Sequence, residues 1–407
     1  MKVSPGNITI SYSTLFYIYK IFGLAPFSYK SNNNISIKYR VIDYIIIGFW
    51  IIFYSFTLFV TTKQFFYEIY PVIDRIHIFL TIYYTTFYMK CFVYLISIIT
   101  INKHNIPNIL ISIFELDTKL FEFNYKLEMY KKEGIKMVLQ LFSIIFILIC
   151  LFALVYFYCD DMAIKNEEAK ILEFVSKTNS SLINMEFVHL KLILLSRYQH
   201  INSILQEEIK CNNGNSNNHY LHYNAVVPIP NISKPVSLAS INVSAIRKLR
   251  LAHNQLWDIL QAIKKHFQLY VFLEIFIIIT DVVPSAHFLV QNFKDSSMKT
   301  KDLDINCYVT AIAVVIWIVI FLCLFLWMTL LSNKIEEEVK ISLICVQKLM
   351  LFQNVGQGIM TELHRFSNQL SNMKIECNIF GILNLNLNFF CGLIGAIITY
   401  IVVLYQI

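Results

Sequence analysis

Long apolar runs constrain this chain more than any other feature of its sequence. Several of them exceed the length of about 18–20 residues that an α-helix needs to cross a lipid bilayer. Charged residues make up only 15% of the chain, whereas roughly a quarter of the residues in a soluble protein are charged. Inside a bilayer, backbone groups must pair within helices or in a closed barrel, and these runs are too long and continuous for barrel strands. The sequence therefore predicts an all-α polytopic membrane protein.

The apolar runs predict seven transmembrane helices. The fourth run is the weakest, because Glu173, Lys177, Glu186 and Lys191 interrupt it. An odd number of spans without an internal repeat argues against an inverted-repeat transporter. The predicted spans cover residues 41–61, 72–100, 137–158, 171–195, 267–290, 307–331 and 377–405.

Basic residues around the first span predict the orientation of the chain. Residues 1–41 carry five Lys or Arg residues and no acidic one, whereas residues 62–75 carry only two Lys or Arg residues. Lys and Arg gather on the cytoplasmic side of membrane proteins, and the first span often sets the orientation. We therefore expect a cytosolic N-terminus, and seven spans then place the C-terminus outside the cell.

We predict a single domain over residues 1–407. Residues 1–40 form a cytosolic segment and residues 41–206 hold spans one to four. Residues 207–245 are rich in Asn and cannot bury a core, so we expect a disordered cytosolic loop there. Residues 246–407 hold spans five to seven. Apolar residues at helical spacing extend spans four, five and six past the membrane, which predicts a packed bundle of cytosolic helices.

No motif in the sequence predicts an enzyme. We find no hydrolase, kinase, phosphate-loop or zinc motif, and the ten His residues are scattered, so no catalytic residue, cofactor or metal site is expected. The net charge of +7 is spread over the loops and does not indicate nucleic-acid binding. Cys159 and Cys307 both fall at predicted outer helix ends, where they either pair or remain free thiols.

Polar and aromatic side chains inside the spans are candidates for ligand binding. Charged groups in a membrane are costly and mark functional sites by default. Glu186 and Asp281 lie at depths that suit an outward-facing cavity, where they would hold hydroxyl or amine groups. Aromatic rings stack on sugars and on planar alkaloids, and the alternative for all of these residues is ordinary packing. The aromatic candidates at similar depth are Tyr83, Tyr84, Tyr156 and Trp317.

Lys90 in the second span has two interpretations. We favour one in which its long side chain reaches the cytosol, because it lies toward the inner end of the span. In the alternative, Lys90 pairs with Glu274 of the fifth span.

Two Asn residues of the last span predict a polar face. Asn384 and Asn388 lie four residues apart, on one side of a continuous helix. An Asn facing lipid is costly, so these residues either line the inner part of a pore or hydrogen-bond to a neighbouring helix.

The outer end of the last span predicts a gate. Val402, Val403 and Leu404 supply an apolar wall that closes a pore by dewetting, with Gln406 as a polar ring near the exit. The alternative for Gln406 is a frayed terminus among lipid headgroups.

The end of the chain resembles the C-terminal signature of the insect gustatory receptor family. In that signature, a Thr-Tyr pair, here Thr399 and Tyr400, is followed by five apolar residues and a Gln, here Gln406. The family usually ends in Gln-Phe, whereas this chain ends in Ile407, which keeps an apolar side chain. Other segments that resemble the family are Gly23 to Pro26, Glu186 to Asn202, Leu249 to His253 and Glu362 to Leu370.

This resemblance implies a ligand-gated, non-selective cation channel in the plasma membrane of gustatory receptor neurons. The channel would be a homotetramer, or a hetero-oligomer with related receptors, in which the last span lines a central pore for cations. Thr399 and Tyr400 would act as packing anchors. A small-molecule tastant would bind between spans two to six, in the half that faces outward, surrounded by membrane lipids.

The resemblance also bears on the tastant. The main sweet branch resembles Thr-Tyr-Glu at this motif, whereas Ile401 follows Tyr400 here. We therefore expect bitter plant compounds first, and a fructose- or inositol-like polyol second. A different class, a metabotropic seven-span receptor, is the alternative function. Arg197 and Tyr198 match part of an Asp-Arg-Tyr motif, but Ser196 replaces its acid, and the predicted orientation is reversed.

Overall fold

Helices make up most of the protein. The computed structural model describes residues 14–25, 27–32, 34–38, 40–64, 75–100, 105–123, 127–158, 167–215, 243–298, 305–352, 356–373 and 376–406. Cys159 and the side chain of Cys307 lie outside this description, so their predicted pairing stays open.

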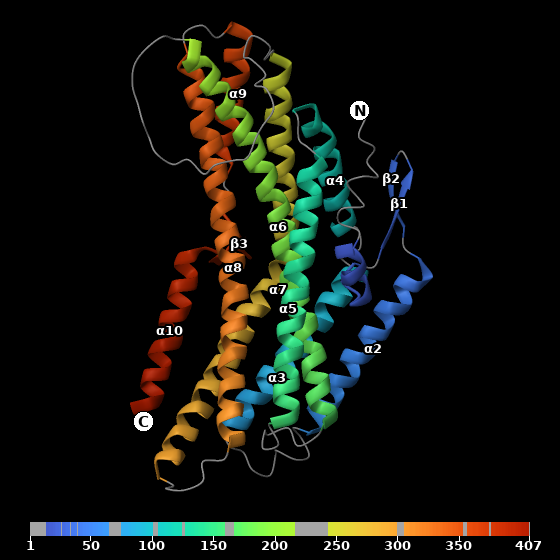
Figure 1. Ribbon diagram of the computed structural model, residues 1–407, viewed down its shortest axis with the longest axis vertical. Helices are drawn as coiled ribbons and strands as arrows, with labels where there is room; N and C mark the ends of the chain where they lie inside the picture. Colours follow the sequence, from blue (N-terminus) through green and yellow to red (C-terminus); the bar gives the residue numbers. More distant parts are fainter. Residues whose placement is uncertain are drawn as a thin grey trace.

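Long helices run side by side along one axis of an elongated molecule (Figure 1). The N-terminal residues 14–21 are also helical. The remaining elements are β1 (Ser28–Asn32), β2 (Asn34–Lys38), α2 (Val41–Gln64), α3 (Arg75–Ile99), α4 (Asn105–Leu120), η2 (Phe121–Phe123), α5 (Leu127–Tyr158), α6 (Glu167–Asn215), α7 (Val243–Met298), α8 (Ile305–Met350), α9 (Gln357–Asn372), β3 (Asn378–Ile379), β4 (Leu383–Asn384) and α10 (Leu387–Gln406).

One half of the molecule, which we call the membrane half, holds the seven predicted spans as α2, α3, α5, α6, α7, α8 and α10. Among the described residues, the segments long and apolar enough to cross a membrane are Val41–Val60, Lys132–Leu154 and Ala311–Met350. Large apolar side chains such as Phe49 and Phe146 point outward there, with 61% and 67% of their surface exposed. Such exposure suits a surface that faces lipid tails.

The other half, which we call the α9 half, is a second helical bundle. It contains α4 and α9 together with the end of α6, the start of α7 and the end of α8 (Figure 1). The predicted extensions of spans four, five and six are therefore confirmed. Helix α4 was not predicted, because its surface is too polar for hydropathy to identify it as a membrane span. Its buried face includes Ile109, Ile113 and Leu116, which follow a helical spacing.

The N-terminal helix ends at a glycine that closes onto the membrane half. Gly23 has φ of +75°, and the backbone N–H of Leu24 donates to Tyr19 O at 2.9 Å, which is a helix stop of the left-handed type. A Cβ at Gly23 would lie 3.1 Å from Cδ1 of Trp50 on α2. The glycine is thus required by both backbone conformation and close packing.

The prediction of one continuous helix over residues 377–405 is wrong. β3 and β4 form a short hairpin that pairs Asn378 with Asn384, and α10 begins only at Leu387. Asn384 therefore lies in a strand and does not share a helix face with Asn388. The cause is local: Gly381 has φ of +73°, which makes the turn, and Asn386 Oδ1 accepts the N–H of Phe389 at 2.8 Å and caps α10.

The loop predicted over residues 207–245 overlaps the ends of two helices. α6 continues to Asn215 and α7 starts at Val243. The central part, residues 216–242, lies outside the described residues, so its predicted disorder stays a prediction.

Candidate functional site

A charged and aromatic cluster lies toward the end of the membrane half that is remote from α9. Lys177 of α6 places Nζ 4.2 Å from the ring centroid of Trp317 on α8, and it contacts Glu173 at 2.6 Å. Asp281 of α7 is close enough for the charges of Lys177 and Glu173 to act on its carboxyl group. We call these four residues the Trp317 cluster. It brings an ammonium, an indole face and two carboxylates together from three helices.

The Trp317 cluster keeps unused binding capacity. Trp317 is half-buried, and its Nε1 has no hydrogen-bond partner among the described residues. The side chains of Lys177 and Glu173 are each 18% exposed, and Asp281 is half-buried. Cation–π attraction holds the Lys177 ammonium over the indole ring. The same ring face is therefore suited to binding the cationic group of a ligand.

The other predicted aromatic residues have different surroundings. Tyr156 of α5 is half-buried, with its ring centroid 5.6 Å from that of Phe152. Phe152 in turn stacks on Phe174 of α6 at 4.3 Å, so Tyr156 belongs to the packing between α5 and α6. Tyr83 and Tyr84 lie on α3, but their side chains are outside the described part of the structure.

Glu186 does not join Asp281, contrary to the expectation of one shared cavity. It follows Lys177 by nine residues on α6, which corresponds to about 13 Å along a helix axis, in the direction of the α9 half. Glu186 is buried, and its Oε2 accepts a hydrogen bond from Tyr94 at 2.7 Å. The Tyr94 hydroxyl also lies 3.5 Å from His266 Nε2. Glu186 therefore belongs to a deeper polar group between α3, α6 and α7.

The favoured interpretation of Lys90 as a side chain that reaches the cytosol is wrong. Lys90 is fully buried, and its Nζ contacts the carboxylate of Glu274 and the hydroxyl of Ser180. Asn184 donates to the second Glu274 oxygen at 2.7 Å. The alternative, an ion pair between the second and fifth spans, is confirmed. A buried charge needs such a partner, because desolvation alone would cost several kcal/mol.

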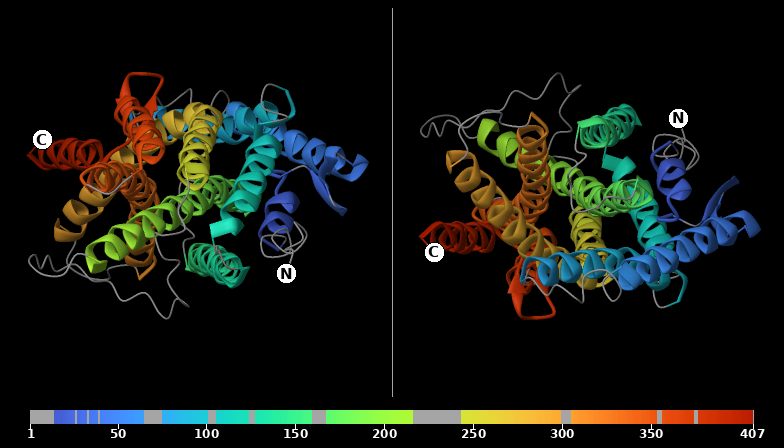
Figure 2. Two further views of the ribbon diagram at one scale, coloured as in Figure 1. Left: turned by 90° about the horizontal axis from the view of Figure 1, so that it is seen from above. Right: turned by 90° about the horizontal axis from the view of Figure 1, so that it is seen from below.

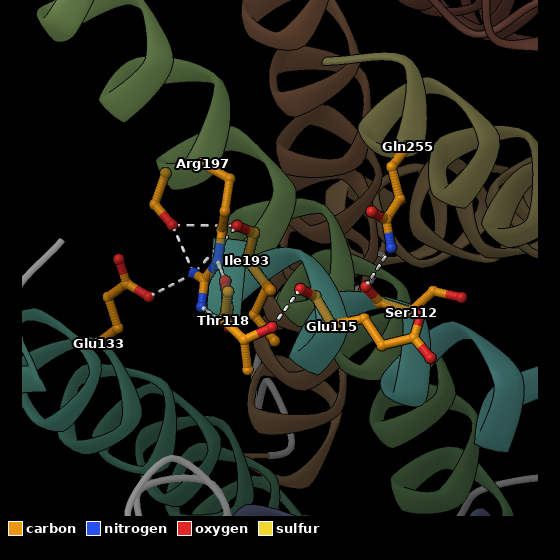
Figure 3. Close-up of polar contacts among 9 residues, drawn as sticks. Ser112, Glu115, Thr118, Glu133, Ile193, Arg197 and Gln255 are labelled. Atoms are coloured by element: carbon orange, nitrogen blue, oxygen red, sulfur yellow. Dashed lines mark hydrogen bonds and ion pairs between the residues drawn. The ribbon is translucent and has the colours of Figure 1, made fainter. Parts of the chain in front are cut away.

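Arg197 joins its own helix α6 to α4 and to the start of α5 (Figure 3). Its Nε and Nη2 donate to the two carboxylate oxygens of Asp117 on α4, each at 3.1 Å. Its Nη1 donates to Glu133 Oε2 on α5 at 2.8 Å (Figure 3). Arg197 and Asp117 are fully buried, so the planar guanidinium fork is matched by two carboxylates inside the bundle.

The residues after Arg197 extend these connections to the remaining helices. The ring of His253 on α7 lies 5.1 Å from that of Tyr198 and 5.7 Å from that of Phe366 on α9. Asn202 donates to the backbone oxygen of Glu338 on α8 at 2.7 Å. We call Arg197, Tyr198 and Asn202 the Arg197 hub.

Burial sets the protonation state of His253, whose ring contacts those of Tyr198 and Phe366. It lowers the pKa of His253 to about 3, so the imidazole is neutral at physiological pH. Both ring nitrogens of His253 are without a hydrogen-bond partner among the described residues. His253 therefore contributes packing between α6, α7 and α9 and carries no charge.

The predicted pore residues lie on a helix with a largely uncovered face. α10 contacts α7 and α8, and it stands at the edge of the molecule when seen along the long axis (Figure 2). Tyr400, Val402 and Val403 are 39%, 49% and 45% exposed. Thr399 donates to its own helix at Gly395 O, 2.8 Å away. In the single chain, Thr399 and Tyr400 are thus not packed into the core. Asn384 and Asn388 are exposed, and the side chains of Leu404 and Gln406 lie outside the description.

The whole-chain comparison decides the class of protein. The family model described as 7tm Chemosensory receptor matches residues 12–407. The chain belongs to this family. None of the curated protein sequences compared with the receptor matches it significantly.

Solved structures share the fold of this chemosensory receptor at low sequence identity. It is similar to the insect olfactory receptor OR5 from Machilis hrabei in complex with eugenol, with 14% identity, a TM-score of 0.66 and coverage of 99% of this chain and 100% of that chain. It is also similar to the same olfactory receptor in a structure described without eugenol, with 13% identity, a TM-score of 0.68 and the same coverage.

Sequence reasoning missed Lys177 and Glu173 of the Trp317 cluster and Asp117, the partner of Arg197. Lys177 was noted only as an interruption of the fourth span, although a lysine within a span is itself a signal. Asp117 lies in α4, which the hydropathy of the chain did not single out. Arg197 has no acidic residue next to it in the sequence. This was the available signal that an acidic partner lies elsewhere in the chain.

Proposed function

We propose that the receptor is a ligand-gated, non-selective cation channel that detects tastants in the plasma membrane of gustatory receptor neurons. The observation that carries the proposal is α10, an apolar helix at the edge of the molecule with an exposed face. Four copies arranged around an axis, as a homotetramer or with related subunits, cover these faces and enclose a pore. Asn388 then lies in the inner part of that pore, and Val402 and Val403 form an apolar gate with Leu404 and Gln406.

On this proposal the receptor is one seven-span domain with its α9 half in the cytosol. The N-terminal segment of residues 1–40 and the loop between α6 and α7 are cytosolic, and the end of α10 is extracellular. This orientation agrees with the excess of basic residues before the first span.

The Trp317 cluster is the proposed ligand site. A protonated amine, which is common among bitter plant compounds, takes the place of Lys177 Nζ on the indole face and is paired by Asp281 and Glu173. A polyol needs several neutral hydrogen-bonding groups that converge on one point, whereas this cluster is aromatic and charged. The cluster therefore favours bitter amines over a fructose- or inositol-like polyol.

Current recording from cells that express the full chain tests both parts of the proposal. Amine tastants and polyols are applied to the wild type and to Asp281→Asn and Trp317→Ala. We expect each variant to raise the half-maximal amine concentration by about tenfold, since cation–π and carboxylate contacts contribute ~1–2 kcal/mol each. Trp317→Phe keeps a ring face and is expected to lose less.

A matched control lies on the same helix as Asp281. Asp258 is exposed in the α9 half, and Asp258→Asn is expected to leave the amine response unchanged. Responses to polyols but not to amines would overturn the ligand class. Silence of surface-expressed receptor with every related subunit would count against the channel itself.

A further inference from the structure

A small cavity lies where α6, α7 and α8 meet the segment before the β3–β4 hairpin. Its lining includes Lys191 of α6, Lys264 of α7, Ser332 of α8, Glu376 and Cys377. Glu376 is exposed and Lys264 and Cys377 are half-buried, so the cavity lies next to the protein surface. This cavity is separate from the Trp317 cluster, since Lys191 follows Lys177 by about four turns of α6.

The cavity holds a lysine and a cysteine in direct contact. Lys191 is 1% exposed, and its Nζ donates to Ser332 Oγ at 2.5 Å and to Cys377 Sγ at 3.5 Å. Cys377 is a half-buried free thiol. Thiols react as thiolates, and a neighbouring ammonium stabilises the negative charge on sulfur. The position combines a nucleophile and a cation beside a void of about 20 Å³, which is the size of a single water molecule, so an electrophile reaches Cys377 from the protein surface.

Other cysteines of the described chain have different surroundings. Cys91 and Cys345 are buried. Cys150 and Cys323 are exposed, but they lie within the apolar stretches of α5 and α8 that are long enough to cross a membrane, and the exposed Cys391 lies on the shorter apolar helix α10. Lipid around a thiol disfavours its ionisation, which makes these cysteines inert by comparison.

We propose that Cys377 is a covalent modification site for small electrophiles of the α,β-unsaturated carbonyl class. Cys377 loses its proton to water, and the ammonium of Lys191 stabilises the resulting thiolate. The sulfur attacks the β-carbon, a C–S bond forms, and the electron pair of the C=C bond moves onto the carbonyl oxygen. The resulting enolate then takes one proton from water at its α-carbon. The addition needs no oxidant and has no leaving group.

An adduct at this position disturbs the support of α10. The carbonyl oxygen of Cys377 accepts the N–H of Leu385 at 2.9 Å and so closes the hairpin that precedes α10. Phe380 at the hairpin turn contacts Phe272 of α7, with ring centroids 5.8 Å apart. An adduct on Cys377 is larger than this cavity, so it displaces the hairpin and changes the opening of the pore; this consequence, unlike the reaction, rests on the proposed channel function.

Labelling of the full-length receptor in membranes tests the reaction without any current. N-ethylmaleimide serves as the electrophile, and mass spectrometry follows the adduct on the peptide that contains Cys377. We expect Cys377 to react about tenfold faster in the folded receptor than in the urea-unfolded chain. An equal or slower rate in the folded receptor overturns the site, and this comparison needs no variant to fold.

Two substitutions test the role of the lysine. Lys191→Met removes the charge and is expected to lower the labelling rate about tenfold, whereas Lys191→Arg restores most of it. Cys323→Ser is the matched control and is expected to leave labelling at Cys377 unchanged. An unchanged rate in Lys191→Met, with labelling in the folded receptor intact, would overturn the role of Lys191.

Current recording separates the gating consequence from the chemistry. The reagent is expected to change ligand-evoked current irreversibly in the wild type and not in Cys377→Ser. Labelled receptor with unchanged current would overturn the effect on gating but keep the reaction. Absence of any ligand-evoked current before treatment would instead be a failure of the channel proposal.

Discussion

At the scale of single residues, Arg197 shows how a charge is kept inside the α9 half. Its guanidinium reaches carboxylates of both α4 and α5, and neither it nor Asp117 is exposed. Such a pair contributes little net stability compared with apolar packing, but removal of one partner leaves an uncompensated buried charge.

Arg197→Met is therefore expected to destabilise the receptor by ~3–5 kcal/mol, because Asp117 remains buried without its partner. Thermal unfolding of detergent-purified receptor measures this loss. Lys340→Met removes an exposed ion pair on α8 and should leave the midpoint unchanged. A second substitution, Asp117→Asn in the Arg197→Met background, should recover part of the loss. If the unfolding midpoint does not recover, the unpaired charge of Asp117 is not the cause of the destabilisation.

Glu208 near the end of α6 gives the receptor a pH-dependent stability. Burial, with a smaller effect from Glu207, raises the pKa of Glu208 from 4.5 to about 7. The folded state favours the protonated carboxyl group, so this contribution is complete below pH 4.5 and is lost as the pH rises through about 7. Glu208→Gln should remove this fall. The neutral, buried His253 has the opposite effect, because its contribution to the stability of the receptor is lost as the pH falls below 6.5. The unfolding midpoints of Glu208→Gln and wild type are therefore compared at each pH, so that the effect of His253 cancels. If the unfolding midpoints of Glu208→Gln and of the wild type change with pH in the same way, the pH dependence does not come from Glu208.

Single residues also mark the limit of what the sequence predicts. Lys90 and Glu274 were recognised as a possible pair, because two opposite charges in separate spans are rare. The sequence does not say which helices touch, and the choice between a paired and a solvated lysine depends on that contact. For the same reason Glu186 and Asp281 looked equivalent, although different helices surround them.

At the scale of elements, the start of α10 depends on two short signals. Gly381 makes the hairpin turn and Asn386 caps the helix, and both lie inside a run that hydropathy alone reads as one span. Apolar length is a property of tens of residues, whereas turns and caps are decided by one or two. The seven spans were therefore predicted well, and the boundary of the last one was not.

Asn386→Ala is expected to destabilise the beginning of α10 by ~1 kcal/mol, because the N–H of Phe389 loses its acceptor. Asn386→Asp keeps an acceptor and should behave like the wild type. Hydrogen exchange of the first turn of α10 measures the difference. Equal exchange in the alanine and aspartate variants would show that the side-chain cap is not used.

At the scale of the whole molecule, the exposed apolar face of α10 faces lipid in a single chain and, in the proposed assembly, is covered by other copies. One chain leaves Val402 and Val403 uncovered, while the opposite side of α10 packs on α7 and α8. Composition and hydropathy predicted the class and the span number, because the thickness of a bilayer sets how long each apolar run must be to cross it. Hydropathy does not predict how several copies assemble, because a side chain that faces lipid and one that faces another apolar helix have the same apolar character.

Val402→Ser is expected to raise the current without ligand by about tenfold, because a polar ring hydrates the proposed gate, and tenfold corresponds to only ~1.4 kcal/mol. Whole-cell recording at matched surface expression measures it. Phe146→Ser on the outward side of α5 is the control and should add no current. A Val402→Ser receptor that stays closed without ligand would place the gate elsewhere.

The contact between Lys177 and Trp317 has a consequence for sensitivity. A side chain tethered to the same protein competes for the indole face at an effective concentration on the order of millimolar or above, which no dilution lowers. If this cluster is the ligand site, as proposed, an external amine must displace this fixed competitor, and weak amines at low concentration are expected to leave the receptor at rest. On that proposal the lysine sets a detection threshold, and its length and position determine the concentration at which a compound first evokes a response.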